Sequence, residues 1–522
     1  MRTLFAAVIG AAATLSAVSA TAQQDQNWSA AATQDLQAIH DALRDNSPEV
    51  YMDQDSAQFR AWLDAGLAQA QKQPLGKVNN VAAYADALKY YTVGFRDANI
   101  ALDPNWEERP ASFAASYPGF STAWRGGAYV VAYDDPNFKN LPPVGATLIS
   151  CDRVAAEDIA KQRLDRYEGD LTTESGRFES APYLLWDRAN TMLPPLPQKC
   201  DFNVGGRKRT FPITETFSKT EAREAAVNAA APHPTGLGIE SFDGGYWISL
   251  HSLSERQSWT PLLNQIDQNI AAIRAAPVVV IDLRGADGGS VRSGFRVLSR
   301  LWGAPFVTVS NPPATKIAYR TSKANQDFYR NVAARLQADP MTAMGAAQWS
   351  QLADQLAAAA AQNQPILQRD ENAIRAAAES PAAVAPELPK EGAAPVAGET
   401  PPPPPPPAAA PAGPPVNQMK GRVIVLTDYW CSGACLYVMD TLTRMPNVQQ
   451  AGTQTSADSI YIGQSSIRLP SGNAGIMFGD KAWLDRPRKT NVPYAPAAGL
   501  VYTGNLADEA AVKAWVGQVA GH

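Results

Sequence analysis

Two segments far apart in the chain carry the pattern of buried strands, and they most constrain the fold. They are Pro277–Gly289 (PVVVIDLRGADGG) and Arg422–Leu436 (RVIVLTDYWCSGACL). Each begins with apolar, largely β-branched residues and then passes into small residues, as expected where a buried parallel strand ends. Ligands of open α/β sheets bind beyond the carboxyl ends of the strands. Both loops are therefore predicted to lie at a functional site.

The two loops offer complementary chemistry. The first supplies glycine amides that could stabilise an anion, and the second supplies a serine near the expected start of a helix. An oxyanion site beside a nucleophile is the arrangement that acyl transfer requires. The sequence therefore indicates acyl-transfer chemistry at this edge of the sheet.

Residues 1–22 have the pattern of a secretory signal. Arg2 supplies the positive charge, Leu4–Val18 the apolar stretch, and Ala20–Ala22 the small residues of a cleavage site. The mature protein is therefore expected to be periplasmic or secreted. No later segment is long enough to span a membrane. The formal net charge of -5, without a basic stripe, argues against nucleic-acid binding.

The four cysteines are Cys151, Cys200, Cys431 and Cys435. An exported compartment permits disulfides. Cys151 and Cys200 are expected to pair because they lie in the same part of the sequence. Cys431 and Cys435 lie on one face if the helix has already begun. Two structural disulfides are predicted. The alternatives are a nucleophilic cysteine, which oxidation disfavours, and a zinc site, although no histidine lies near any cysteine in the sequence.

The mature chain changes character several times. Residues 23–105 have apolar residues at helical spacing, and residues 106–220 have short β-like runs between glycines and prolines. Residues 235–352 alternate strand and helix signals, and residues 417–522 resume them. These last two parts are predicted to form one α/β core.

The intervening residues 353–416 are rich in alanine and proline and include the uninterrupted proline run Pro401–Pro407. Their alanine-rich start could be helical, and the proline run is expected to form polyproline II. Such a stretch cannot bury a core, so it is predicted to be a disordered insertion that splits the α/β core. The alternative is a spacer or a docking peptide for an aromatic groove.

Several segments resemble the tail-specific, or C-terminal-processing, serine peptidase family. They are YYTVGFRDANIAL at 90–102, VGATLISCDRVAAEDI at 144–159, VVVIDLRGADGG at 278–289, VIVLTDYWCSGACLYVMD at 423–440, AGTQTSAD at 451–458 and RLPSG at 468–472. The resemblance implies a crotonase-like (ClpP-like) α/β core, an N-terminal helical region and a PDZ-like β-rich domain at residues 106–220. It also implies serine peptidase chemistry on polypeptides, without a metal or other cofactor.

The resemblance also assigns site residues. Backbone amides at Gly288 or Gly289 would help form the oxyanion hole, although these glycines could instead serve only a tight turn. The family's nucleophile precedes a small residue, and alignment on Ala434–Cys435 places that position at Gly433. Ser432 lies one place earlier, and a shift of one residue in a helix rotates a side chain by about 100°. Ser432 is the nucleophile candidate if the turn is rebuilt, and otherwise a helix N-cap.

The general base departs from the family pattern. The stretch that would supply a lysine, Gly452–Arg468, contains none, and the Asp-x-His motif of a second branch ends here in Asn99. Asparagine cannot accept a proton near neutral pH. His251, which follows the strand expected at Tyr246–Leu250, is the best replacement base. The other histidines are His40, His233 and His522.

Two principal functions remain open. One is an exported serine-type peptidase with an incomplete or rearranged catalytic set, and the other is a pseudopeptidase that binds polypeptide tails without cleavage. A third is a non-proteolytic hydrolase or isomerase, since related cores host other chemistry. A polypeptide is the expected partner in the first two cases, and the sequence does not define the oligomeric state.

Overall fold

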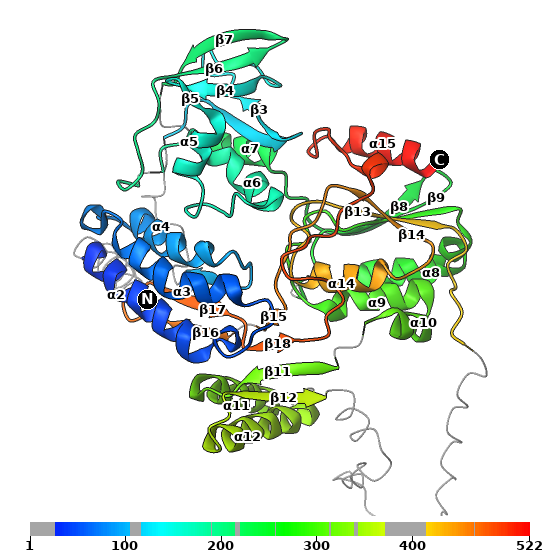
Figure 1. The fold of residues 1–522 in the computed structure, drawn as a ribbon. Helices are drawn as coiled ribbons and strands as arrows, with labels where there is room; N and C mark the ends of the chain where they lie inside the picture. The colour runs from blue at the N-terminus through cyan, green and yellow to red at the C-terminus, as the bar shows by residue number, and fades with distance from the viewer. Residues whose placement is uncertain are drawn as a thin grey trace, which may run out of the picture.

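The computed structural model describes residues 27–104, 116–188, 190–214, 220–255, 257–312, 315–338, 343–370, 414–463 and 465–521. The predicted signal segment, the run Pro401–Pro407 and His522 lie outside the described residues. Within them the chain is a mixed α/β protein with sheets of three, four, five and six strands (Figure 1). Among the helices that the structure describes, none combines the length and apolar character that a bilayer-spanning segment needs.

The central sheet has the strand order β14-β13-β10-β9-β8. Its strands are β8 (Leu237–Phe242), β9 (Gly245–Leu250), β10 (Val278–Asp282), β13 (Arg422–Thr427) and β14 (Val448–Gly452). β9, β10, β13 and β14 are parallel, whereas β8 forms an antiparallel hairpin with β9. Val278 pairs with Arg422 and Asp282 pairs with Leu426. The predicted parallel pairing of the two buried-strand segments is therefore confirmed.

Helices cover both faces of the central sheet, as buried parallel strands require. They are α8 (Thr260–Ala275), α9 (Val291–Trp302), α10 (Ala304–Ser310) and α14 (Ala434–Leu442) on one face, and α15 (Glu509–Gly521) on the other (Figure 1). Alternate residues of β10 supply the two faces. Val279 and Ile281 pack with the first group, and Val278 and Val280 pack with α15.

An N-terminal helical domain packs against a three-stranded sheet. Its elements are α2 (Trp28–Asn46), α3 (Ala57–Gln71), α4 (Val81–Thr92), β1 (Ala101–Pro104), β16 (Ser465–Arg468) and β17 (Ala474–Phe478). Ile476 and Phe478 are buried in the same cluster as Leu36 and Leu88. Strands from the C-terminal part of the sequence thus complete this domain, whereas the sequence assigned all of residues 417–522 to the core.

A β-rich domain has the strand order β2-β3-β4-β6-β7, with β5 beside β4. Its elements are β2 (Phe120–Arg125), β3 (Ala128–Asp134), β4 (Thr147–Cys151), β5 (Val154–Ala155), α5 (Ala156–Arg163), α6 (Glu174–Ser180), β6 (Lys199–Val204), β7 (Arg207–Pro212) and α7 (Thr220–Ala230). The disulfide between Cys151 and Cys200 joins β4 to β6. Cys431 and Cys435 form a second disulfide at the start of α14. Both predicted disulfides are confirmed, and they rule out the zinc and free-thiol alternatives for these four cysteines.

The start of the predicted insertion belongs to a folded unit, which corrects that prediction for residues 353–370. The elements of this unit are β11 (Lys316–Arg320), α11 (Lys323–Ala338), α12 (Ala346–Ala361), β12 (Ile366–Asp370), β15 (Tyr461–Ile462) and β18 (Lys481–Trp483). Leu352 and Leu356 of α12 are buried, and the ring of Trp349 stacks on Tyr329 of α11 at 5.5 Å. Small alanines between these larger residues let α12 approach α11 closely. Residues 371–413 of the predicted insertion lie outside the described residues.

We predict that Leu356→Ala lowers the free energy of unfolding by about 2–5 kcal/mol, because it leaves a cavity in the α11–α12 unit. The exposed Gln351→Ala on the same helix is the matched control, with an expected change within about 0.5 kcal/mol. Urea denaturation of both variants measures the difference. Equal stabilities of the two variants would show that α12 does not contribute to the core.

Candidate functional site

The elbow loop, Asp428–Gly433, connects β13 to α14. Gly433 is the N-cap of α14, with φ 50° and ψ -116°, a left-handed conformation that favours glycine. A Cβ atom on Gly433 would lie 3.5 Å from Cα of Gly288, an ordinary contact. Sharp strand-to-helix turns of this strained type expose the nucleophilic serine in α/β-hydrolases. Position 433 thus has the geometry expected of a nucleophile position, and it carries no side chain.

Ser432 ties the elbow loop to the glycine loop, Leu283–Gly289, which follows β10. Its backbone N–H donates to the carbonyl of Ala286 at 3.2 Å, and its own carbonyl accepts from the N–H of Cys435 at 3.0 Å. The N-cap of α14 is Gly433 and not Ser432, so the predicted N-cap role of Ser432 is wrong. The helix α14 therefore begins one residue later than it would if Ser432 were its N-cap.

The two predicted oxyanion glycines have different surroundings. A Cβ atom on Gly288, where φ is 142°, would meet nothing within 4 Å, so Gly288 faces open space beside Gly433. A Cβ atom on Gly289 would lie 2.4 Å from the carbonyl carbon of Leu253. The next amide, of Ser290, donates to the carbonyl of Leu253 at 2.9 Å. Gly288 therefore lies at the elbow, whereas Gly289 serves a close approach of two backbone segments.

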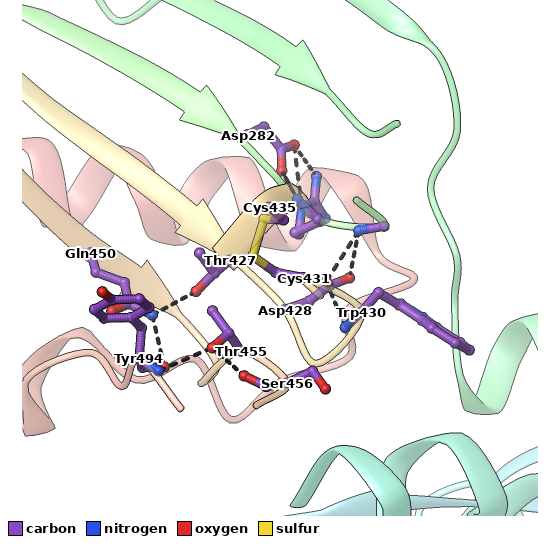
Figure 2. Close-up of a disulfide and its surroundings, with 12 residues drawn as sticks. Asp282, Thr427, Asp428, Trp430, Cys431, Cys435, Gln450, Thr455, Ser456 and Tyr494 are labelled. Carbon is purple, nitrogen blue, oxygen red and sulfur yellow. Dashed lines mark hydrogen bonds and ion pairs between the residues drawn. A yellow bond between two sulfur atoms is a disulfide. The ribbon is translucent and has the colours of Figure 1, made fainter. Parts of the chain in front are cut away.

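Asp428 holds the elbow loop and the glycine loop together (Figure 2). The N–H of Gly285 donates to both carboxylate oxygens of Asp428, at 3.1 and 3.0 Å, and the N–H of Trp430 donates to one of them at 3.0 Å. The side chain is fully buried. Burial raises the pKa of Asp428 to about 7, although the amide donors act in the opposite direction. This buried carboxyl group and the hydrogen bond from Ser432 to Ala286 together hold the two loops beside one another.

His251 is fixed by structural contacts and offers no free nitrogen to Ser432. Its Nε2 lies 3.0 Å from a carboxylate oxygen of Asp282, and its Nδ1 lies 3.2 Å from the carbonyl of Thr235. Burial works against protonation of His251, but Asp282 outweighs it and the pKa of His251 is raised. Both ring nitrogens of His251 thus face oxygen atoms of the protein. The geometry thus does not support the predicted role of His251.

The carboxylate that holds His251 also forms a buried ion pair. Arg284 donates through Nη2 to Asp282 at 2.7 Å and to the exposed Glu509 at 3.0 Å. Burial of Asp282 is outweighed by Arg284 and His251, which lower the pKa of Asp282 to about 2. This ion pair therefore fixes Asp282, the last residue of β10, at the start of the glycine loop.

Asn99 lies in a turn that is linked to the elbow loop. Its N–H donates to Asp97 at 2.9 Å, and the other oxygen of Asp97 accepts from Ser459 Oγ at 2.6 Å. Three residues before Ser459, the N–H of Ser456 donates to the carbonyl of Cys431 at 3.1 Å. Asn99 Nδ2 is buried and has no hydrogen-bond partner among the described residues. The turn of Asn99 is thus linked to Ser459, and Asn99 itself carries an amide that cannot act as a base.

The stretch Gly452–Arg468, which contains no lysine, places a carboxylate near the elbow instead. Asp458 is buried and pairs with Arg486 at 3.1 Å and with Arg488. Both arginines also approach Asp440 of α14, at 3.6 and 3.5 Å. The two carboxylates and the two arginines thus form one buried ion-pair cluster.

Sequence reasoning did not single out His233, which the structure places between the two loops. His233 Nε2 lies 3.3 Å from a carboxylate oxygen of Asp287, and its ring meets Trp430 edge to face at 4.8 Å. Asp287 immediately precedes Gly288, and its carboxylate raises the pKa of His233. His233 is flanked by prolines in the sequence, and no spacing rule connects it to a residue in the glycine loop.

Aromatic contacts dock the β-rich domain on the elbow loop. Phe178 of α6 packs against Tyr429 at 4.9 Å and against Trp430 at 5.9 Å. The indole N–H of Trp430 donates to the carbonyl of Pro232 at 2.9 Å. The elbow loop is therefore covered by another domain on one side and bound to the glycine loop on the other.

Comparisons with known proteins identify the fold. No family model and no curated protein matches the chain. The structure of mature CPAF matches with a TM-score of 0.54 and 12% identity, over 95% of this chain and 98% of that chain. A serine-to-alanine mutant of CPAF matches with a TM-score of 0.57 and 12% identity, over 95% and 99%. The photosystem II D1 C-terminal processing protease matches with a TM-score of 0.35 and 10% identity, over 94% and 98%.

The expected resemblance to C-terminal-processing serine peptidases is thus confirmed at the level of the fold. The fold of CPAF is shared along almost the whole of this chain. At this level of identity the comparison concerns the fold alone.

The contrast between the two glycines is testable. We predict that Gly289→Ala lowers the melting temperature more than Gly288→Ala does, because both changes strain the backbone by about 1–3 kcal/mol but only the first also collides with Leu253. Differential scanning calorimetry of the two variants measures the difference. A larger loss for Gly288→Ala would contradict the assignment of the close backbone approach to Gly289.

The buried carboxyl group of Asp428 should make the free energy of unfolding depend on pH. Because folding raises the pKa of Asp428, the folded state binds the proton more tightly, and the resulting stability is lost as the pH rises from about 4 to about 7. In Asp428→Asn this part of the pH dependence should disappear. Urea denaturation of both proteins at the two ends of this range tests it, and parallel losses in the two proteins would show that Asp428 titrates normally.

Proposed function

We propose that this protein is an exported relative of the C-terminal-processing serine peptidases that binds polypeptides without cleaving them efficiently. The observation that carries the proposal is Gly433. The position with the geometry of a nucleophile faces Gly288 and lacks a side chain. A hydroxyl at Ser432, one residue earlier, is directed differently from a side chain at position 433.

The groups around the elbow support the same conclusion. Asn99 cannot accept a proton, both nitrogens of His251 are engaged, and Asp458 is paired with arginines. A hydroxyl without a base is a poor nucleophile. Amide donors and substrate binding alone leave a residual acceleration of about 10³–10⁴ over water in peptidases that have lost their catalytic residues. Any turnover should therefore be slow.

The likeness of the fold to CPAF supports the binding of a polypeptide. We take the central domain to be a crotonase-like core and the β-rich domain to be PDZ-like, in a chain whose fold is similar to that of CPAF. A complex of mature CPAF with lactacystin also matches this chain, with a TM-score of 0.54. The pattern at residues 1–22 and the two disulfides support export to the periplasm or beyond.

A second candidate is slow cleavage by Ser432 with His233 as its base. The observation that favours it is the pair of His233 and Asp287, which lies between the elbow loop and the glycine loop. A histidine oriented by a carboxylate is the usual partner of a nucleophilic serine. This candidate requires the Ser432 hydroxyl to reach His233, and the variants below separate it from the first.

We predict that wild type, Ser432→Ala and His233→Ala are equally inactive on a quenched-fluorescent unfolded protein. The combined change Gly433→Ser and Asn99→His should raise turnover at least tenfold over Asn99→His alone, because a Cβ atom at 433 has room beside Gly288. Thermal melting checks that each variant folds. Efficient cleavage by wild type that Ser432→Ala abolishes would contradict the proposal, and loss with His233→Ala as well would establish the second candidate.

A further inference from the structure

A cavity of about 120 Å³ lies between the β-rich domain and the central domain, next to the elbow loop. Its wall includes Tyr429 of the elbow loop and Thr453, which follows β14. The other walls come from the turn between β2 and β3, from α6 and from residues 501–504 and 506. Four of the side chains that line it are aromatic: Trp124, Phe178, Tyr429 and Tyr502. A ligand in the cavity would therefore contact an apolar surface beside the elbow.

Arg125, the last residue of β2, supplies the cavity with a positive charge. Its Nη2 donates to the carbonyl of Ala229 at 3.0 Å and to Asn505 Oδ1 at 2.8 Å. Neither partner is charged, and no carboxylate forms an ion pair with Arg125 within the described ranges. Burial lowers the pKa of Arg125, as expected for a cation without a counter-ion. Two neutral oxygens thus orient a partly buried cation whose charge is not neutralised.

The one carboxylate that lines the cavity is already engaged. Glu174 accepts a hydrogen bond of 2.6 Å from the indole N–H of Trp124. The guanidinium of Arg177 lies 4.7 Å from the centre of the same indole ring and pairs with Glu157. Glu174 is thus fixed on the Trp124 side of the wall, while Arg125 is fixed by Asn505.

Segments of the chain itself cover β2 near its start. Ser121 Oγ donates to the carbonyl of Ala226, and Thr122 Oγ1 donates to the carbonyl of Ala181, both at 2.7 Å. The cavity at the other end of β2 is open at the turn, where added Cβ atoms on Gly126 and Gly127 would meet nothing within 4 Å.

We propose that this cavity binds a carboxylate of the polypeptide ligand on Arg125, with the neighbouring apolar group of the ligand against Tyr429 and Tyr502. The carboxylate is that of an acidic side chain or of a chain end. This inference rests on the proposed function, because it assumes a polypeptide ligand. A carboxylate completes an ion pair that the folded protein leaves unformed, and charge-assisted hydrogen bonds to a partly buried arginine are among the stronger polar contacts.

Fluorescence anisotropy with a labelled octapeptide tests the proposal. The peptide Gly-Ser-Gly-Ser-Leu-Phe-Ala-Phe is used as the free acid, as the C-terminal amide, and as the amide with the alanine replaced by glutamate. Wild type should bind at least one of the two carboxylate-bearing peptides about tenfold more tightly than the plain amide. Which of the two binds better distinguishes a chain end from an acidic side chain.

The same preference is then measured in three variants. It should fall to about onefold in Arg125→Gln, persist in Arg125→Lys, and persist in Arg207→Gln, which changes an exposed arginine of the same domain. Equal affinities of wild type for all three peptides, or a preference that survives in Arg125→Gln, would overturn the inference and leave the proposed function standing. Failure of wild type to bind any of the peptides would overturn both, and efficient cleavage would overturn only the proposed function.

Discussion

The parallel pairing of β10 with β13 determines where every part of the site lies. The pairing is in register from Val278 with Arg422 to Asp282 with Leu426, so the two strands end together. The glycine loop and the elbow loop therefore leave the sheet side by side. The carboxyl group of Asp428 then fixes their separation by accepting from amides of both loops. A sheet with any other strand order would separate Gly288 from Gly433.

Contacts between domains cover the elbow loop and join the helical domain to the β-rich domain. Phe178 covers the elbow loop from the β-rich domain, and Arg96 of the helical domain pairs with Asp165 and Asp170 of the β-rich domain. Binding energy that is realised equally with substrate and with transition state holds a polypeptide without accelerating its cleavage. The proposed absence of a nucleophile at Gly433 would leave these contacts intact.

Some features of the structure could be predicted from short stretches of the sequence. The pairing of β10 with β13 followed from two apolar runs and their small-residue exits, and both disulfides followed from spacing and compartment. In each case the signal lies in a few consecutive residues.

Other features depend on contacts that leave no local signal. The pair of His233 and Asp287 forms because the chain entering β8 passes the glycine loop, and neither residue stands out in its own segment. β17 reads as a core strand, but its register with β1 places Ile476 in the helical domain. The second half of α12, from residue 353, was assigned to the insertion because alanine carries little information, whereas Leu356 between the alanines sets its buried face. Tertiary packing, and not the local sequence, determines where these segments lie.

The most direct test of the central claim, that the nucleophile position is empty, is a covalent one. The folded protein is exposed to a large excess of a serine-reactive fluorophosphonate, and its intact mass is then measured beside an active serine peptidase. The account predicts an unmodified protein, because Gly433 has no hydroxyl and Ser432 has no base. A single stoichiometric adduct on Ser432 that forms only in the folded state would contradict it.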